Sequence, residues 1–203
     1  AGILDNYAAA GITNILALRG DPPGGQRCFQ ATPDGFHTAA ELVGFVKREY
    51  AAMSIGVAGF PEGHPETPNR LQELDYLKAK VDAGADYICT QMFFDNHYFY
   101  DFAERCGDVG IDVPLVAGIM PAVSLQRVSR MADLAAGTCF PAPLLRFLSA
   151  AASPEAAEAV GVHWATHQVL DLIANGVSGI HFYTLNQAAA CMQICRTLSL
   201  SRH

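Results

Sequence analysis

Short apolar runs alternate with polar turns and amphipathic stretches along this chain. The apolar runs lack strict polar–apolar alternation, which is typical of parallel strands buried on both faces. Because amphipathic stretches separate the runs, the pattern predicts alternating strands and helices around a parallel sheet. Five strands are expected, at Ile12–Leu18, Ile55–Phe60, Asp86–Phe93, Pro114–Met120 and Gly179–Thr184.

Helices are predicted where apolar residues recur at helical spacing between capping residues and glycines. Ser124 and Ser153 are each placed to cap a helix, and Pro154 suits the first helical position. The expected helices are Thr38–Ala52, Asn69–Ala83, Tyr98–Cys106, Ser124–Leu134, Ala142–Ala150, Pro154–Ala174 and Asn186–Leu198.

Polar residues gather where the predicted strands end, and no G-x-G-x-x-G fingerprint of an open dinucleotide-binding sheet follows a strand. Such strand-end residues favour an eight-stranded β/α barrel, whose chemistry lies at the carboxyl ends of its strands. With only five strands in view, we expect a single α/β domain over 1–203, a partial (β/α)8 TIM-barrel type. The strand-end residues are Arg19, Asp21, Glu62, His64, Gln91, Asp95 and Asn186.

Composition narrows the functional classes. The 203 residues are 51% hydrophobic and 16% charged, as in a globular protein. A net charge of −7 without a basic cluster argues against a nucleic-acid partner. No apolar run predicts a membrane span and no signal peptide is evident, and the six cysteines form no C-x-x-C pair. We therefore expect a cytoplasmic protein with reduced thiols.

Five segments carry a resemblance to a known family. They are ALRGDPP at 17–23, VAGFPEGHPE at 57–66, KAKVDAGADYICTQMFFDN at 78–96, PLVAGIMP at 114–121 and GIHFYTLNQ at 179–187. In these segments, in this order and spacing, the chain resembles methylenetetrahydrofolate reductase, a flavin-dependent β/α barrel enzyme.

The resemblance implies reduction of 5,10-methylenetetrahydrofolate to 5-methyltetrahydrofolate, with FAD as cofactor and NAD(P)H as donor. The family barrel has three further strands before ALRGD, and the first carries the glutamate that protonates folate. This chain is thus similar to the C-terminal part of that barrel, and we expect it to be inactive alone. We also expect a homo-oligomer.

Site residues follow by matching the family's motifs residue by residue. Asp21 is the expected catalytic carboxylate, facing flavin and pterin, where its charge would stabilise a cationic folate intermediate. Further flavin contacts are expected at Arg19, Gly20, Thr38, Ala39, Ala58, Phe60, His64, Glu73 and Lys80, and substrate contacts at Gln91, Arg127, Leu185 and Gln187.

The match has departures. Thr38 and Phe60 replace tyrosines found in relatives, and Gln187 stands where relatives often carry arginine. Arg127 replaces a glutamine, and Met131 replaces a phenylalanine. The changes at Gln187, Arg127 and Met131 affect the expected folate and nicotinamide contacts, whereas those at Thr38 and Phe60 each remove an aromatic hydroxyl from the expected flavin contacts.

Alternatives remain at this point. Turn aspartates and charged helix faces also occur without catalytic roles. His163 and His167 share a helix face, but no third ligand is evident, so no metal is expected. The chain could be a non-catalytic flavin- or folate-binding barrel. It could also be another flavin-dependent reductase or a pterin-binding methyltransferase.

Overall fold

A single five-stranded parallel sheet organises the protein, with strand order β1-β2-β3-β4-β5. We analysed a computed structural model, which describes residues 2–20, 31–32, 35–64, 67, 69–135 and 137–199. Because each strand pairs with the next in sequence, every connection is a β/α crossover. The strands are β1 (Asn14–Ala17), β2 (Ser54–Gly59), β3 (Tyr87–Met92), β4 (Leu115–Ile119) and β5 (Gly179–Phe182).

The helices lie within a few residues of the predicted ranges, with one addition. The helix α1 (Gly2–Ala9) was not predicted, because it has no buried residue and so no clear apolar stripe. The others are α2 (Ala39–Glu49), α3 (Arg70–Asp82), α4 (Asn96–Asp108), α5 (Leu125–Leu134), α6 (Ala142–Ala150), α7 (Pro154–Ala174) and α8 (Ala189–Thr197).

Predicted caps fix several helix starts. The Ser124 hydroxyl accepts from the N–H of Arg127 and the Ser153 hydroxyl from that of Ala156, as expected of N-cap residues. Thr38 caps α2 in the same way, accepting from the N–H of Glu41. The side chain of Thr38, expected to contact flavin, thus has a structural role at the start of α2.

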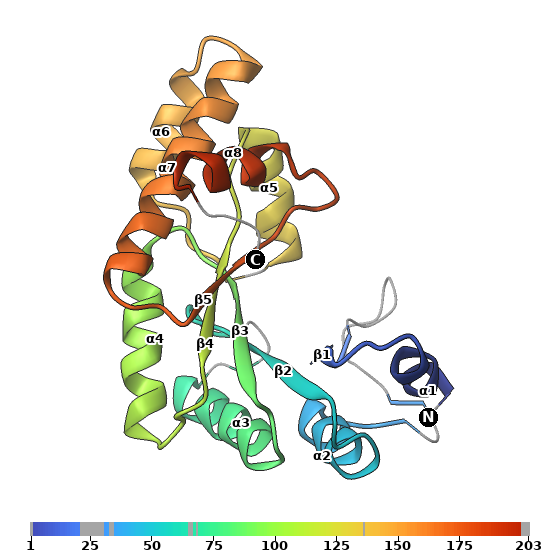
Figure 1. The fold of residues 1–203 in the computed structure, drawn as a ribbon. Coiled ribbons are helices and arrows are strands. Elements are labelled where there is room, and N and C mark those ends of the chain that lie inside the picture. Colours follow the sequence, from blue (N-terminus) through green and yellow to red (C-terminus); the bar gives the residue numbers. More distant parts are fainter. Residues whose placement is uncertain are drawn as a thin grey trace.

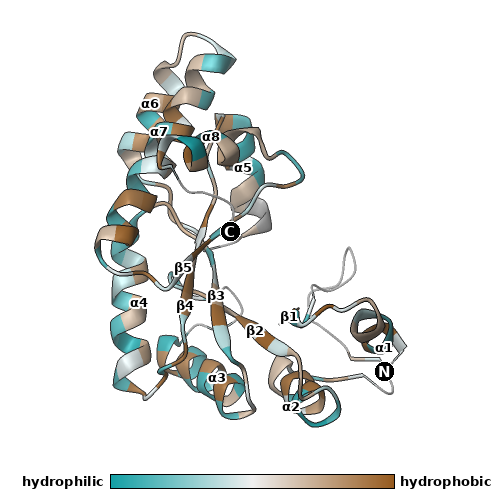
Figure 2. Ribbon diagram, viewed as in Figure 1, coloured by the Kyte–Doolittle hydropathy of each residue, from teal (hydrophilic) through white to brown (hydrophobic). Residues whose placement is uncertain are grey.

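Helices pack against the strands on the outer side of a curved sheet, while α5 to α8 gather around the carboxyl end (Figure 1). Brown, hydrophobic segments run along β2 and β4, whereas α2, α3 and α4 each carry teal residues (Figure 2). The core between the first strands and helices is built from fully buried aliphatic side chains, among them Val43, Val46, Ile55, Val57 and Ile88.

One ion pair ties the amino ends of β2 and β3 to α2. The Lys47 ammonium donates to both carboxylate oxygens of Asp86, at 2.7 and 2.9 Å. The N–H of Ile55 donates to the same carboxylate at 2.7 Å. Burial by itself would raise the pKa of Asp86, but these bonds outweigh it and hold the pKa below its ordinary value.

The two outer strands differ from the expectation of strands buried on both faces. In β1, Leu16 is 42% exposed, and Leu18 just beyond it is 52% exposed. In β5, His181 is exposed and its neighbours are half-buried. Within the described residues each of these strands pairs with a neighbour on one side, which accounts for the exposure of its other side. The predicted partial barrel of about five parallel strands is confirmed.

Within the described part of the chain, no helix combines the length and apolar character that crossing a membrane requires.

Candidate functional site

The carboxyl end of β2 brings together five of the predicted flavin residues. The Lys80 ammonium, from α3, donates to the backbone oxygen of Ala58 at 2.6 Å. In the loop after β2, the ring of His64 meets the ring of Phe60 edge-on, with centroids 4.6 Å apart. The N–H of His64 donates to Glu73 Oε2 at 3.1 Å, which joins this loop to α3.

Burial sets the electrostatics of this cluster. Burial lowers the pKa of Lys80 to about 8, and the nearby Glu73 carboxylate offsets only part of that change. Burial likewise raises the pKa of Glu73, against the effect of the His64 N–H. Among the described residues, no donor reaches Glu73 Oε1, although this atom is buried. A solvated helix face, the ordinary explanation for this charged pair, therefore does not apply to Lys80.

Gln91 lies at the adjacent strand end. The last pair between β2 and β3 joins Gly59 to Thr90, and Phe60 and Gln91 are the residues that follow them in the two chain segments. Gln91 is half-buried, and its Oε1 accepts from the N–H of Met92 at 3.0 Å. We expected this amide to donate and accept at once toward a ligand. The Met92 N–H takes one acceptor position of this oxygen, whereas the Nε2 group has no partner among the described residues.

Two predicted substrate residues meet beyond the carboxyl ends of β4 and β5. The Arg127 guanidinium, at the start of α5, donates to Gln187 Oε1 in the loop after β5. Leu185, in the same loop, is 55% exposed and has a positive φ of 45°. A positive φ in a non-glycine residue stores backbone strain, and such strain is concentrated at functional loops.

The remaining predicted flavin residues lie after β1 and at the start of α2. Arg19 and Gly20 follow β1 on its exposed side, and Gly20 has the left-handed φ of 78° that favours glycine. Ala39 is the first residue of α2. In the portion of the chain with described placement, no hydrogen bond links Thr38 or Ala39 to the Lys80 cluster. Asp21, the expected catalytic carboxylate, lies outside the described residues.

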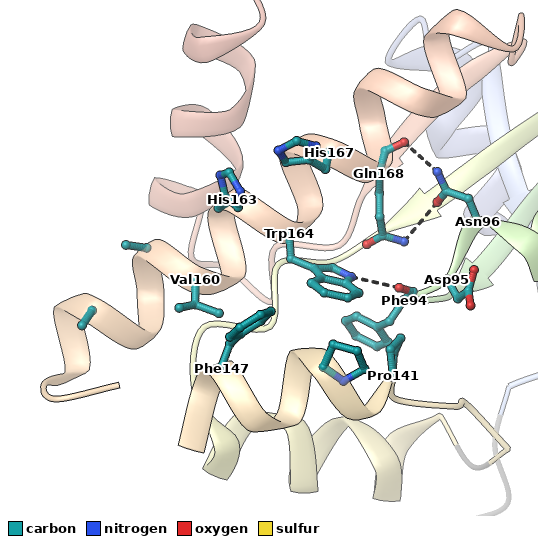
Figure 3. Close-up of a pocket in the computed structure, with 13 residues that line it drawn as sticks. Phe94, Asp95, Asn96, Pro141, Phe147, Val160, His163, Trp164, His167 and Gln168 are labelled. Atoms are coloured by element: carbon teal, nitrogen blue, oxygen red, sulfur yellow. Dashed lines mark hydrogen bonds between the residues drawn. The ribbon is translucent and has the colours of Figure 1, made fainter. Parts of the chain in front are cut away.

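A separate groove lies between α6 and α7, with a volume of about 1180 Å³. Figure 3 shows Phe147, Val160, Trp164 and Pro141 along its apolar wall, with the imidazoles of His163 and His167 above. Asp95, one of the predicted strand-end residues, lines this groove, but none of the predicted flavin or substrate contacts does. Sequence reasoning did not anticipate it, because its walls come from elements that are adjacent only after folding.

The His163 and His167 rings lie 4.5 Å apart, as their helical spacing predicts. Over the described residues, however, no group of three or more His, Cys, Asp or Glu side chains could hold a metal ion.

Two further residues near the strand ends were missed. The hydroxyl of Tyr183, which follows β5, donates to the backbone oxygen of Thr90 at 2.9 Å. Thr90 is completely buried in β3. A threonine inside an otherwise apolar run was the available signal, since a buried hydroxyl needs a hydrogen-bond partner.

Comparison with known proteins decides the family. Residues 1–199 match the family model described as methylenetetrahydrofolate reductase. The chain belongs to the methylenetetrahydrofolate reductase family. It is 40% identical to methylenetetrahydrofolate reductase (NADH) 1 of Arabidopsis thaliana over 97% of its length, and 39% identical to 5,10-methylenetetrahydrofolate reductase of Salmonella typhimurium over 98%. It spans 35% of the plant relative and 64% of the bacterial one.

A solved structure supports the fold of this family member. An uncharacterized protein from Clostridium thermocellum, which binds two copies of 5-methyl-5,6,7,8-tetrahydrofolic acid, superposes with a TM-score of 0.54. The match covers 87% of this chain and 65% of that chain, at 15% sequence identity. The resemblance predicted from the five segments is therefore confirmed at the level of family and fold.

Proposed function

We propose that this chain is part of an enzyme that reduces 5,10-methylenetetrahydrofolate to 5-methyltetrahydrofolate, with FAD as cofactor and NAD(P)H as electron donor. Family membership supports the reaction. The observation that supports flavin binding is the Lys80 ammonium and the buried Glu73 Oε1 atom at the carboxyl end of β2, which is where a barrel of this type holds its ligands.

The chemistry of this pair fits the polar part of FAD. Glu73 Oε1 is a buried acceptor that lacks a donor among the described residues, and a ribose hydroxyl would supply one. Lys80 uses one of its three N–H donors on Ala58, so its positive charge and remaining donors suit a diphosphate. When bound, FAD would supply the hydride chemistry, and the protein's share is binding and orientation.

Other predicted residues would divide the remaining tasks. The rings of Phe60 and His64 would offer an apolar surface and a polar edge beside the flavin. The Nε2 group of Gln91 would donate to an acceptor on the pterin. Asp21 would stabilise positive charge on the folate, and the paired Arg127 and Gln187 would contact the substrate's polar end.

Flavin binding tests the first part of this proposal. In a titration of the chain with FAD, followed by quenching of flavin fluorescence, Lys80→Met is expected to weaken binding about tenfold or more, because it removes a charged donor. Lys78→Met is the matched control, since Lys78 lies on the same helix but pairs with Asp82. Equal affinities for both variants and the wild type would contradict the assignment of Lys80.

Reduction of bound flavin tests the second part. Anaerobic addition of NADH or NADPH should bleach the flavin absorbance if the chain retains the donor half of the reaction. We propose that the chain alone does not complete folate reduction, because this sequence contains no counterpart of the family's acid motif. Bound flavin that neither donor bleaches would instead favour the non-catalytic binding barrel.

A further inference from the structure

The end of β3 contains a β-bulge directly before the proposed folate contact. Cys89 pairs with Val116 of β4, but the next pair is Met92 with Gly118, so β3 has one residue more than its partner. The extra residue interrupts the regular ladder, and backbone groups there need other partners. Thr90 and Gln91 are the residues within this bulge.

Two side chains, one in β3 and one directly after β5, supply hydrogen bonds to the bulged backbone. The Thr90 hydroxyl accepts from the N–H of Gly118 at 2.9 Å, in place of a backbone oxygen. The Thr90 backbone oxygen in turn accepts from the Tyr183 hydroxyl at 2.9 Å. This oxygen belongs to the peptide group that joins Thr90 to Gln91, so the tyrosine fixes the peptide plane from which Gln91 extends.

Space for this arrangement exists only because residue 118 is glycine. A Cβ at Gly118 would lie 2.3 Å from the Thr90 backbone oxygen and 2.8 Å from the Tyr183 ring. Both distances are far shorter than van der Waals contact, so no larger residue fits without displacing the bulge. Gly118 thus allows the tyrosine ring and the bulged strand to approach each other.

The direction of the Gln91 amide follows from the same geometry. A backbone N–H can donate only to the oxygen of a primary amide, so the bond from Met92 fixes Oε1 and leaves Nε2 pointing away. Among the described residues, Nε2 has no hydrogen-bond acceptor. A ligand acceptor opposite this group, such as a ring carbonyl oxygen or an unprotonated ring nitrogen, would satisfy the Nε2 donor.

We propose that Thr90, Gly118 and Tyr183 are positioning residues, which hold the β3 bulge so that the Nε2 group of Gln91 donates to a carbonyl oxygen or ring nitrogen of the bound pterin. This inference rests on the proposed folate-binding function of Gln91. Tyr183 acts on the ligand only through the Thr90–Gln91 peptide.

The first experiment needs no ligand. In the full chain labelled with ¹⁵N, the side-chain amide signals of Gln91 are identified by their loss in Gln91→Leu. Tyr183→Phe keeps the ring but removes the hydroxyl, and it should move these signals toward the position of a freely rotating glutamine. Tyr100→Phe is the matched control, because the Tyr100 hydroxyl bonds Asp171 between α4 and α7. Unmoved Gln91 signals in Tyr183→Phe would overturn the inference.

Thr90 provides a conservative rescue of the same signal. Thr90→Ser retains the hydroxyl that accepts from Gly118, so the Gln91 signals should stay near their wild-type positions. Thr90→Val has a similar shape but no acceptor, so it should displace them. Equal Gln91 signals in the two variants would contradict a role for the hydroxyl.

The second experiment measures affinity for 5-methyltetrahydrofolate by calorimetry. Tyr183→Phe should weaken binding about three- to tenfold, the range expected for one hydrogen bond. In the Gln91→Leu background the same change should have no further effect, because the two residues act as one unit. An equal loss in both backgrounds would show a merely structural role and refute the inference.

The two proposals fail separately. If Gln91→Leu binds the folate as well as the wild type, or if the wild type binds none, the folate role of Gln91 in this chain is wrong. The amide signals still decide whether Tyr183 and Thr90 orient Gln91. If Gln91→Leu weakens binding but Tyr183→Phe does not, the proposed function stands and the positioning role is refuted.

Discussion

Lys80 gives a stability prediction that follows directly from its burial. Its ammonium is bonded to the Ala58 backbone oxygen inside the folded chain, and burial lowers its pKa from 10.5 to about 8. In the unfolded chain the same group is solvated, and its pKa returns to the ordinary value near 10.5. Between these two pH values the unfolded state holds more protons than the folded state.

The sign and size of the effect follow from proton linkage. Stability rises with pH wherever the unfolded state binds more protons, so Lys80 makes the free energy of unfolding increase from about pH 8 to about pH 10.5. Each pH unit in that window is worth about 1.4 kcal/mol. Keeping Lys80 charged at neutral pH therefore costs about 3 kcal/mol, most of which is recovered by about pH 10.

Urea denaturation at pH 7 and pH 10 measures this contribution. Lys80→Met removes the titrating group, so the free energy of unfolding of the wild type should rise relative to the variant by about 2.5 kcal/mol between the two pH values. The difference between variants cancels the titration of all other groups. Lys78→Met, on the same helix, should instead follow the wild type.

Parallel pH profiles for the wild type and Lys80→Met would refute the reasoning, since they would mean that Lys80 is solvated in the folded state. The same titration bears on ligand binding. If Lys80 contacts the FAD diphosphate, affinity for FAD should fall as the pH rises above about 8, because the unliganded residue then loses its charge.

Three further outcomes follow from buried or crowded positions. Gly118→Ala should lower the free energy of unfolding by about 1–3 kcal/mol or more in urea denaturation, because the added Cβ would overlap backbone atoms. Gly44→Ala is the control: its Cβ would meet no atom in the middle of α2, so it should raise the free energy of unfolding by up to about 1 kcal/mol. Burial raises the pKa of Cys106 to about 11, so iodoacetamide should label this thiol only after unfolding. The exposed Cys139 should be labelled in the folded protein, and peptide mass spectrometry distinguishes the two sites. The folded-state pKa of Asp86 is lowered, so Asp86→Asn should have a lower free energy of unfolding than the wild type at neutral pH. This difference should vanish as the pH falls below the ordinary carboxyl range, and a constant difference down to acid pH would contradict the prediction.

Local patterns in the sequence predicted the strands and most helices correctly. These elements depend on residues only a few positions apart, so a short stretch of sequence is enough to predict them. Examples are the buried strands β2, β3 and β4 and the caps at Ser124 and Ser153. The missed helix α1 illustrates the limit, because an element without a buried face leaves no hydrophobic period to read.

The candidate site was predictable only as a set of residues. The family resemblance placed Ala58, Phe60, His64 and Lys80 in the site, and Glu73 joined them by its helical spacing to Lys80; the structure brings these five together at one strand end. The sequence could not say that the Lys80 ammonium is buried or that a backbone N–H already occupies the oxygen of Gln91. Those properties depend on which groups from other elements surround each side chain.

By itself, then, the sequence determined the order of the strands and of the helices after α1, the parallel sheet and the family, because hydrophobic periods, caps and motifs are local features. Only the tertiary structure decided the pairing of Arg127 with Gln187 and the bond from Tyr183 to Thr90. Such contacts depend on strand register and on a one-residue bulge in β3, and a shift of one residue would redirect every side chain involved. The physical reason is that contacts between distant residues form only when the whole sheet is assembled.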